Sequence, residues 1–228
     1  MSKKKLFALA VVVIMIAILS FSSLAWFTDA DEVKNEFMVA GSDSGKPDDI
    51  FSVAVWENVP GETTNEGHVY ENILPGDKLK KQVYVENTGS YDQYVRVIVT
   101  ISDAQAWMAA LGTEYSPIAL FDGFDPTMWT HIWNNVSEAE DPTQLENLVY
   151  VLYLKDVLPG GDCASVKVFD NVQIPDSLTR EQAAEFEGGF TIDVKAQAVQ
   201  TENVVPEGTK DEDAAWAAFN YVNMGIGD

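Results

Sequence analysis

Histidine is a common metal ligand and acid–base catalyst, and this chain has two, His68 and His131. A helical zinc protease site needs two histidines one turn apart with a glutamate between them. His68 is followed by Glu71 but by no second histidine nearby, and His131 also stands alone in its segment. The spacing therefore predicts no metal site, unless the fold brings the two histidines together.

The candidate nucleophiles lack the partners that would activate them. Residues 41–45 read GSDSG, so Asp43 stands where the serine of a GxSxG nucleophile elbow belongs. Cys163 is the only cysteine, which excludes an intramolecular disulfide and favours a small buried side chain. We expect no catalytic residues and no cofactor, although a glycosidase-like pair of carboxylates stays open in so acidic a chain.

Two acidic loops offer oxygen ligands of the kind that calcium prefers. Asp122 and Asp125 belong to one, and Glu138, Glu140 and Asp141 form the other. Neither spacing matches an EF-hand loop, so calcium is a weak possibility beside ordinary solvated turns. Residues 115–142 are also rich in aromatic side chains, which can stack on a sugar but are expected mainly to pack as core.

The N-terminus is typical of a secretory signal peptide. Lys3, Lys4 and Lys5 precede the unbroken apolar run 6–19, and small residues follow, with Ser23-Leu24-Ala25 fitting the small-x-small rule. We expect cleavage between Ala25 and Trp26. An uncleaved anchor helix is the alternative, but the apolar run is shorter than the roughly 20 residues of a stable span.

The net charge limits the kinds of partner that the exported chain can bind. The net charge is −22, and removal of residues 1–25 with their three lysines makes it −25. Such a charge favours solubility and repels nucleic acid and anionic membranes. We expect a secreted, extracellular or cell-surface protein that meets the membrane only through its signal peptide, with about 203 residues (26–228) forming one domain.

Apolar residues alternate with polar ones along most of the mature chain. This period of two predicts antiparallel strands with one buried and one wet face. Six or more such strands, separated by Pro, Gly, Asn and Asp, predict an all-β sandwich. The segments are 51–56, 82–86, 94–101, 148–154, 165–169 and 191–198.

Turns and three short helices complete the expected sandwich. Leu-Pro-Gly turns occur at 74–77 and 158–162, each with proline and glycine at the central positions of a type II turn. The patterns predict helices at 103–111 behind an Asp103 cap, at 178–186 with Ser177 or Thr179 as cap, and at 211–222 with Trp216 and Phe219 on one face. Residues 115–142 are irregular and are expected to form a covering loop.

Three sequence motifs lie near the two ends and in the first hairpin of the mature chain. The first is AWFTD at 25–29 with NEFMVAG at 35–41. The second and most specific is a PGDK…ENxGS…YVRV hairpin that includes Pro75, Gly76, Asp77, Glu86, Asn87, Gly89 and Ser90. The third and loosest is AQAVQ at 196–200 followed by AAW at 214–216. Together these motifs resemble the TasA/CalY (camelysin) family of exported proteins with a SipW-type signal peptide, whereas residues 103–156 match nothing in that family.

The resemblance implies a jelly-roll-like sandwich, export through a W-type signal peptidase, and a role in surface fibres or biofilm matrix. It also implies that the segment 26–40, once freed by cleavage, becomes a strand in a neighbouring subunit. Val33, Phe37 and Val39 are spaced so that they can share one face of that donor strand, with Asn35 as a polar interruption. The alternative is that residues 32–40 form the first strand of their own sheet.

We therefore expect a structural protein: a TasA-like fibre subunit or accessory component that forms a homo-oligomer or joins a fibre as co-subunit. A camelysin-like secreted metallopeptidase is the second hypothesis, which rests on the family resemblance more than on residues. A monomeric surface adhesin or sugar binder is the third, which rests on the aromatic residues of 115–142.

Overall fold

The structure is a computed structural model that describes residues 28–32, 52–59, 62–64, 69–70, 73–112, 116–162, 164–184, 186 and 190–222. The expected signal peptide with its cleavage site at Ala25–Trp26 lies outside the described residues. So do Val33, Phe37, Val39, His68 and Cys163, and for His131 only the backbone is described.

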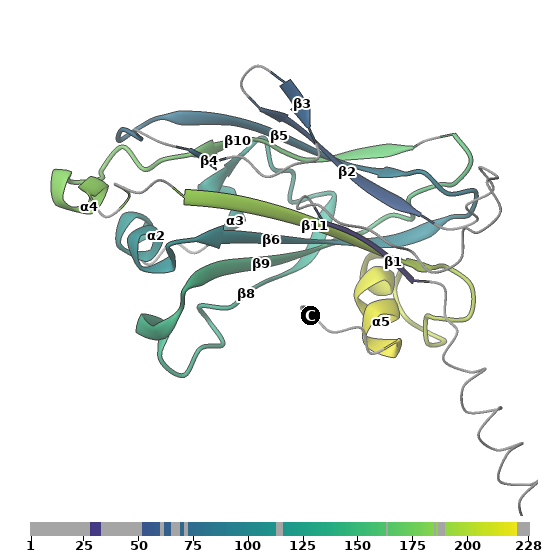
Figure 1. Cartoon of the computed structure of the whole chain (residues 1–228). Coiled ribbons are helices and arrows are strands. Elements are labelled where there is room, and N and C mark those ends of the chain that lie inside the picture. Colours follow the sequence, from purple (N-terminus) through teal and green to yellow (C-terminus); the bar gives the residue numbers. More distant parts are fainter. Residues whose placement is uncertain are drawn as a thin grey trace, which may run out of the picture.

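Two antiparallel sheets pack face to face and confirm the expected all-β, jelly-roll-like sandwich (Figure 1). The first sheet has the order β1 (Thr28–Glu32), β11 (Phe190–Gln200), β6 (Gln93–Ser102), β9 (Asn147–Leu154) and β8 (Trp129–Asn134), with β4 (Val69–Tyr70) also on β11. The second has the order β3 (Glu62–Thr64), β2 (Val53–Val59), β5 (Lys78–Asn87), β10 (Ser165–Gln173) and β7 (Phe121–Asp122).

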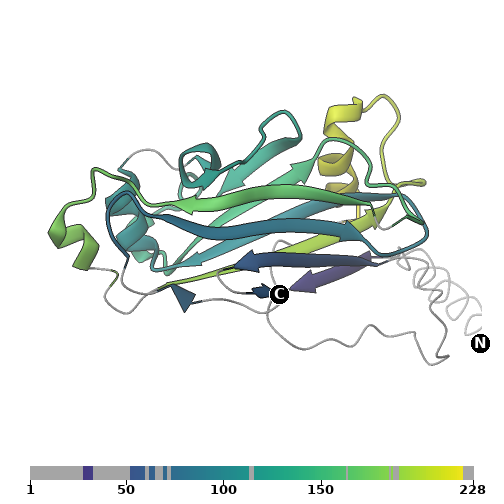
Figure 2. The same ribbon diagram turned by 90° about the horizontal axis from the view of Figure 1, so that it is seen from above.

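Alternating apolar residues on the inner faces of both sheets form the main core. Along β6, Val95, Val97, Val99 and Ile101 are all fully buried, as their period of two predicts. The inward residues of β5 and β11 meet them from the facing and neighbouring strands. Figure 2 shows the two layers from above. All six strands expected from the sequence are present, most of them longer than their apolar cores.

The outer face of β6 is not wet, contrary to the simple alternation rule. Helix α5 (Ala214–Tyr221) covers it, and Phe219 packs against Ile98 and Tyr153 in a second apolar cluster. Arg96 is also buried there. The strand pattern alone could not reveal this cover, because the helix lies over 100 residues further along the chain.

The helices have the expected places with some corrected details. Asp103 precedes α2 (Ala104–Leu111) with a φ of 62°, but its side chain does not cap the helix; its carboxylate accepts from Ser102 instead. Thr179 is the cap of α4 (Arg180–Ala184), exchanging hydrogen bonds with Gln182 as a capping box. Figure 1 places α2 and α4 at one end of the sandwich and α5 at the other.

Trp216 and Phe219 do not share a buried face. Phe219 is 1% exposed, whereas Trp216 is 42% exposed at the side of α5. Positions three apart on a helix are about 60° apart around the axis. That angle is enough to place one ring against the sheet and the other at the solvent edge.

Residues 115–142 are part of the sandwich and not a covering loop. They supply α3 (Pro117–Leu120), β7 and β8, so the segment contributes a strand to each sheet. β7 has two residues, and β8 has a register shift between Thr130 and Trp133. Strands that are so short or bulged carry no usable alternation, which explains the missed assignment.

The first Leu-Pro-Gly turn is the expected type II turn and the second is different. The amide of Asp77 donates to the carbonyl of Leu74 at 3.1 Å, and Gly76 has a φ of 84°. In the second turn the positive φ belongs to Gly161, at 90°, and not to Gly160. Gly160 is needed for another reason, because a Cβ there would lie 2.5 Å from the backbone of Ser90.

Candidate strand-acceptor edge

β11 is the strand of the first sheet at which the N-terminal segment joins the body. On one side it pairs with β6 over residues 192–200. On the other side β4 covers residues 190–191 and β1 covers residues 195–199. Within the described part of the chain, residues 192–194 have no strand partner on that second side. The side of β11 that faces away from β6 is the strand-acceptor edge.

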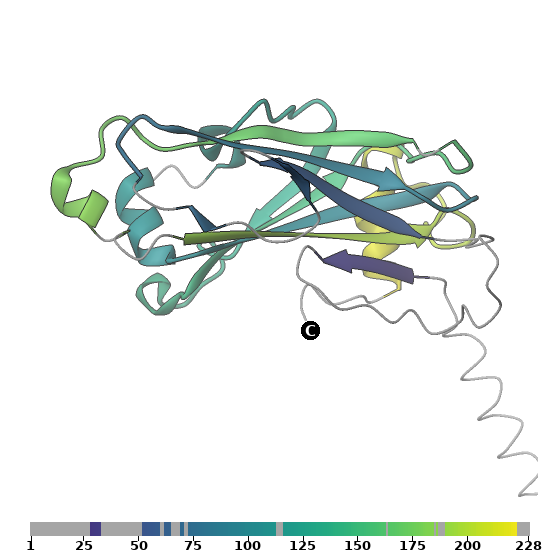
Figure 3. The same cartoon turned by 45° about the horizontal axis from the view of Figure 1, so that its top comes forward.

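β1 occupies the acceptor edge within the same chain, and it also contacts β2 (Figure 3). Its register pairs Thr28 with Val199 and Glu32 with Lys195. β1 lies within the segment 26–40 that is the expected donor strand, whereas Val33, Phe37 and Val39 of that segment lie outside the described residues. Because β1 reads TDADE, its chemistry is unlike that of a strand held by apolar side chains.

The cis register gives the apolar edge two acidic partners. Asp29 pairs with Ala198 and Asp31 pairs with Ala196, and both alanines are fully buried on the core side of β11. Opposed residues of an antiparallel ladder share a face. In this register two acidic residues of TDADE are the ladder partners of buried alanines of β11.

A buried polar cluster lies in the sheet directly beside the edge. Arg96 donates from Nε to Gln197 Oε1 at 2.6 Å, and its guanidinium lies 4.5 Å from the ring centroid of Phe219. Burial lowers the pKa of Arg96, while the hydrogen bond from its guanidinium to Tyr153 acts in the opposite direction. Since Gln197 is also the β11 partner of Ala30, this cluster links the acceptor edge to α5.

The family-motif residues around Asn87 form a structural clasp. The Asn87 amide donates to the carbonyls of Tyr91 and Leu158, both at 2.9 Å, and its oxygen accepts from the amide of Gly89 at 2.9 Å. Ser90 is exposed, and Glu86 accepts from the indole of Trp56 at 2.8 Å. The hydrogen bonds of Asn87 therefore join the β5–β6 loop to the second Leu-Pro-Gly turn. This loop lies at the opposite end of β5 from the first Leu-Pro-Gly turn.

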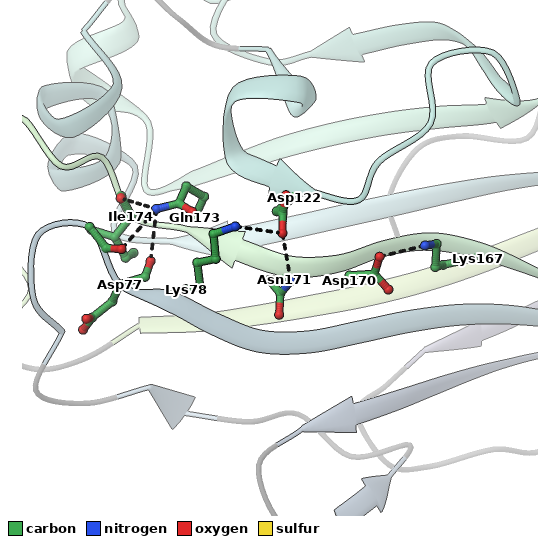
Figure 4. A network of polar contacts seen from close by, with 9 residues as sticks. Asp77, Lys78, Asp122, Lys167, Asp170, Asn171, Gln173 and Ile174 are labelled. Carbon is green, nitrogen blue, oxygen red and sulfur yellow. Dashed lines mark hydrogen bonds and ion pairs between the residues drawn. The ribbon is translucent and has the colours of Figure 1, made fainter.

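The Pro75–Asp77 part of the motif lies at that first turn, beside a polar network on the outer face of the second sheet (Figure 4). Asp77 closes its own turn by accepting from the amide of Leu74 at 2.8 Å. Gln173 donates to the carbonyls of Gly76 and Asp77, at 3.3 and 3.5 Å. These contacts join the turn to the end of β10, and the motif again serves structure.

Three of the five carboxylates proposed for calcium already accept protein hydrogen bonds. Asp122 accepts from Lys78 at 3.3 Å and from Asn171 at 3.0 Å (Figure 4). Asp125 and Asp141 each accept from the amide and hydroxyl of a threonine two residues later, and these bonds lower the pKa of both. Among the described residues no three His, Cys, Asp or Glu side chains are grouped for a metal ion.

The aromatic residues of 115–142 are mostly committed to the core. Phe121, Phe124 and Trp129 are buried, as expected. In the described part of the chain the exposed aromatic side chains lie outside this segment, and two of them, Trp216 and Tyr221, line an open hollow of about 590 Å³ at α5. Trp133 is half-buried and Tyr115 lies outside the described residues, so the sugar-binding hypothesis stays a prediction.

Sequence reasoning missed one pair of charged residues in the interior. Glu57 and Lys81 are both fully buried and in contact. Their positions in the alternation could have revealed them. Glu57 continues the inward series 53 and 55 of its strand, and Lys81 precedes the inward residues 83 and 85 of the neighbouring strand.

Comparisons with protein-family models, with curated proteins and with solved structures found no match. No helix in the described ranges is both long and apolar enough to cross a membrane.

Proposed function

We propose that this protein is an exported structural subunit of an extracellular fibre or biofilm matrix, resembling TasA/CalY proteins, and that subunits join by passing the N-terminal segment to a neighbour. The observation that carries the proposal is the pairing of β1 with the edge of β11. A strand that is held mainly by its backbone ladder can be replaced by the same strand of another copy, because the hydrogen bonds lost and gained are equivalent.

A change of register makes the exchange favourable. If the donor entered with Val33 in the place of Asp29, its odd-numbered residues would meet the core side of β11 in turn. Val33 would then replace the carboxylate of Asp29 opposite Ala198, and Asn35 would replace that of Asp31 opposite Ala196. Phe37 and Val39 would oppose Val194 and Ile192. Each large apolar side chain that becomes fully buried contributes about 1.5–3 kcal/mol.

The shifted donor would also cover the residues of β11 that β1 leaves without a strand partner. Residues 192–194 pair only with β6 among the described strands. A donor running to Val39 reaches Ile192, so the ladder would grow from five residue pairs toward the length of β11. The contact is head-to-tail, and such contacts propagate into filaments instead of closing.

The proposal assigns a physical role to signal-peptide removal. β1 begins at Thr28, two residues after the expected new N-terminus at Trp26. While residues 1–25 are attached, the donor segment is tethered to the membrane and cannot enter a neighbour freely. Cleavage by the W-type peptidase would release it, so export and assembly would be coupled.

The test compares mature protein starting at Trp26 with protein starting at Gly41. The longer form is expected to make filaments visible by electron microscopy, and the shorter form to remain monomeric in sedimentation. Addition of a peptide with residues 26–40 should give a stable one-to-one complex with the shorter form, while a peptide with Val33, Phe37 and Val39 changed to Ser should bind more weakly. Filaments from the shorter form alone would refute donor-strand exchange.

A further inference from the structure

Glu57 and Lys81 lie side by side inside the sandwich on neighbouring strands. Glu57 opposes Val83 in the β2–β5 ladder, so Lys81 is its diagonal neighbour on the same inward face. Both side chains are 0% exposed, and Lys81 Nζ contacts Glu57 Oε2. The flanking inward residues Val55 and Val83 are fully buried core residues.

The carboxylate is incompletely satisfied. Glu57 Oε1 is buried and has no hydrogen-bond partner among the described residues. A buried carboxylate that leaves one oxygen without a donor is costly, and a buried ion pair repays its desolvation only when the remaining polar atoms are also bonded. As an ordinary salt bridge, the pair would therefore not recover the free energy that its desolvation costs.

Both groups are biased toward their uncharged forms. Burial raises the pKa of Glu57 and lowers the pKa of Lys81, against the attraction between the two charges. The negative charge of Asp193 raises the pKa of both groups. Burial and the charge of Glu57 together raise the pKa of Tyr70. Burial therefore opposes the ionisation of both groups, and the uncharged amine and the protonated carboxyl are the forms that condense with each other.

From this geometry we propose that Lys81 and Glu57 join in an intramolecular amide bond that cross-links β2 to β5. The neutral Nζ attacks Cδ of the protonated carboxyl, and the new C–N bond forms as the C–O bond to one oxygen breaks. One proton passes from Nζ to the departing hydroxyl, so one water molecule leaves. No oxidant, reductant or further reactant is required.

Two physical reasons favour the bonded product. Fixed contact between the reacting groups supplies an effective molarity that reaches about 10⁵–10⁸ M in well-oriented cases, which drives a condensation that is poor in dilute water. The product also removes both buried charges, and the unpartnered oxygen can leave as water. What remains is a neutral amide in place of a half-satisfied ion pair.

The amide bond would lie next to the strand-acceptor edge. β2 contacts both β1 and β11, so it is the strand of the second sheet that lies next to the acceptor edge. A covalent tie to β5 would keep β2 in place while the N-terminal segment leaves or enters. This proposal does not depend on fibre formation, because the pair is buried within one subunit.

Mass spectrometry of the purified, denatured mature protein tests the bond directly. The intact mass is expected to be lower than the sequence mass by one water molecule. A tryptic digest should contain a branched peptide joining the Glu57 and Lys81 segments, and Lys81 should resist acetylation after denaturation. A full sequence mass with an acetylatable Lys81 would overturn the proposal.

Matched variants locate the water loss. Lys81→Met and Glu57→Leu are each expected to abolish it, and the double variant, which replaces the pair by apolar side chains, keeps the measurement possible if a single variant fails to fold. Glu57→Gln should give the same cross-linked mass as the wild type, with ammonia lost instead of water. Water loss that persists in the double variant would contradict the assignment.

Discussion

The side-chain amide of Asn87 donates a hydrogen bond to the carbonyl of Leu158 at 2.9 Å, which joins the β5–β6 loop to a turn 71 residues later. Asn87 makes two further hydrogen bonds and is fully buried. We expect Asn87→Ala to lower the free energy of unfolding by about 1–3 kcal/mol, because buried backbone groups lose their partner. Urea denaturation measures this, with exposed Ser90→Ala as a control that should change stability little.

The two glycines of the second Leu-Pro-Gly turn should respond differently to alanine. At Gly160 a Cβ would meet the backbone of Ser90 and Tyr91 at 2.5 Å, whereas nothing lies within 4 Å of a Cβ at Gly161. Gly160→Ala is expected to cost about 1–3 kcal/mol or more through steric overlap. Gly161→Ala should cost about 1–2 kcal/mol through its positive φ alone. Thermal unfolding of both variants gives the order, and an equal loss would contradict the close approach.

Helix α5 should depend on Phe219 and not on Trp216. Phe219 lies against Tyr153 with ring centroids 5.8 Å apart and below the Arg96 guanidinium. Phe219→Ala is expected to cost about 3–5 kcal/mol, as for other buried aromatic residues. Trp216→Ala removes a half-exposed ring and should cost much less. Guanidinium denaturation of the two variants compares them, and a larger effect at Trp216 would show that α5 packs differently.

Acid should weaken the polar network at Asp170. The hydrogen bond from Lys167 lowers the pKa of Asp170, burial opposes the shift, and a hydrogen bond from Gln82 adds to it. Because the folded-state pKa is the lower one, the stabilisation is present above the unfolded value and is lost as the pH falls through the folded value. Asp170→Asn should thus be less stable than the wild type at neutral pH, and the two should converge once the pH falls below the folded-state pKa of Asp170. A difference in stability between the variant and the wild type that does not change with pH would exclude this linkage.

The register shift proposed for donor exchange predicts opposite effects for two substitutions. Asp31→Val places an apolar residue opposite Ala196 in the cis ladder, so it should strengthen β1 on its own edge and slow filament growth. Asn35→Val removes the polar interruption from the donor face and should speed growth. Light scattering at equal protein concentration measures both rates. Similar rates for the two variants would argue against the shift.

The strands were predictable because the alternation of apolar and polar side chains along each strand shows which residues are buried. Val95, Val97, Val99 and Ile101 alternate with outward residues, and this local pattern needs no knowledge of the partner strand. The burial of Arg96 and Ile98 was not predictable, because it depends on a helix that begins at Ala214. Short strands such as β7 carry too few residues for any period to show.

The candidate site was predictable only in part. The motif residues around Asn87 were recognised by resemblance, but their role as a clasp follows from hydrogen bonds to Leu158 that no local pattern encodes. Glu57 and Lys81 were missed because a charge at an inward position looks like an ordinary break in alternation. The strand on the acceptor edge falls within the expected segment 26–40, but the residues TDADE have no apolar periodicity that would mark them as a strand.

The most direct test of donor-strand exchange is a reversible lock across the acceptor edge. Glu32 pairs with Lys195 in the β1–β11 register, and directly opposed residues lie within the Cα distance that a disulfide spans. In a Cys163→Ser background, Glu32→Cys with Lys195→Cys should give oxidised protein that stays monomeric and assembles once a reductant is added, whereas Lys195→Cys alone should assemble under both conditions. Filament growth by the oxidised, fully cross-linked protein at the rate of the reduced protein would contradict the account.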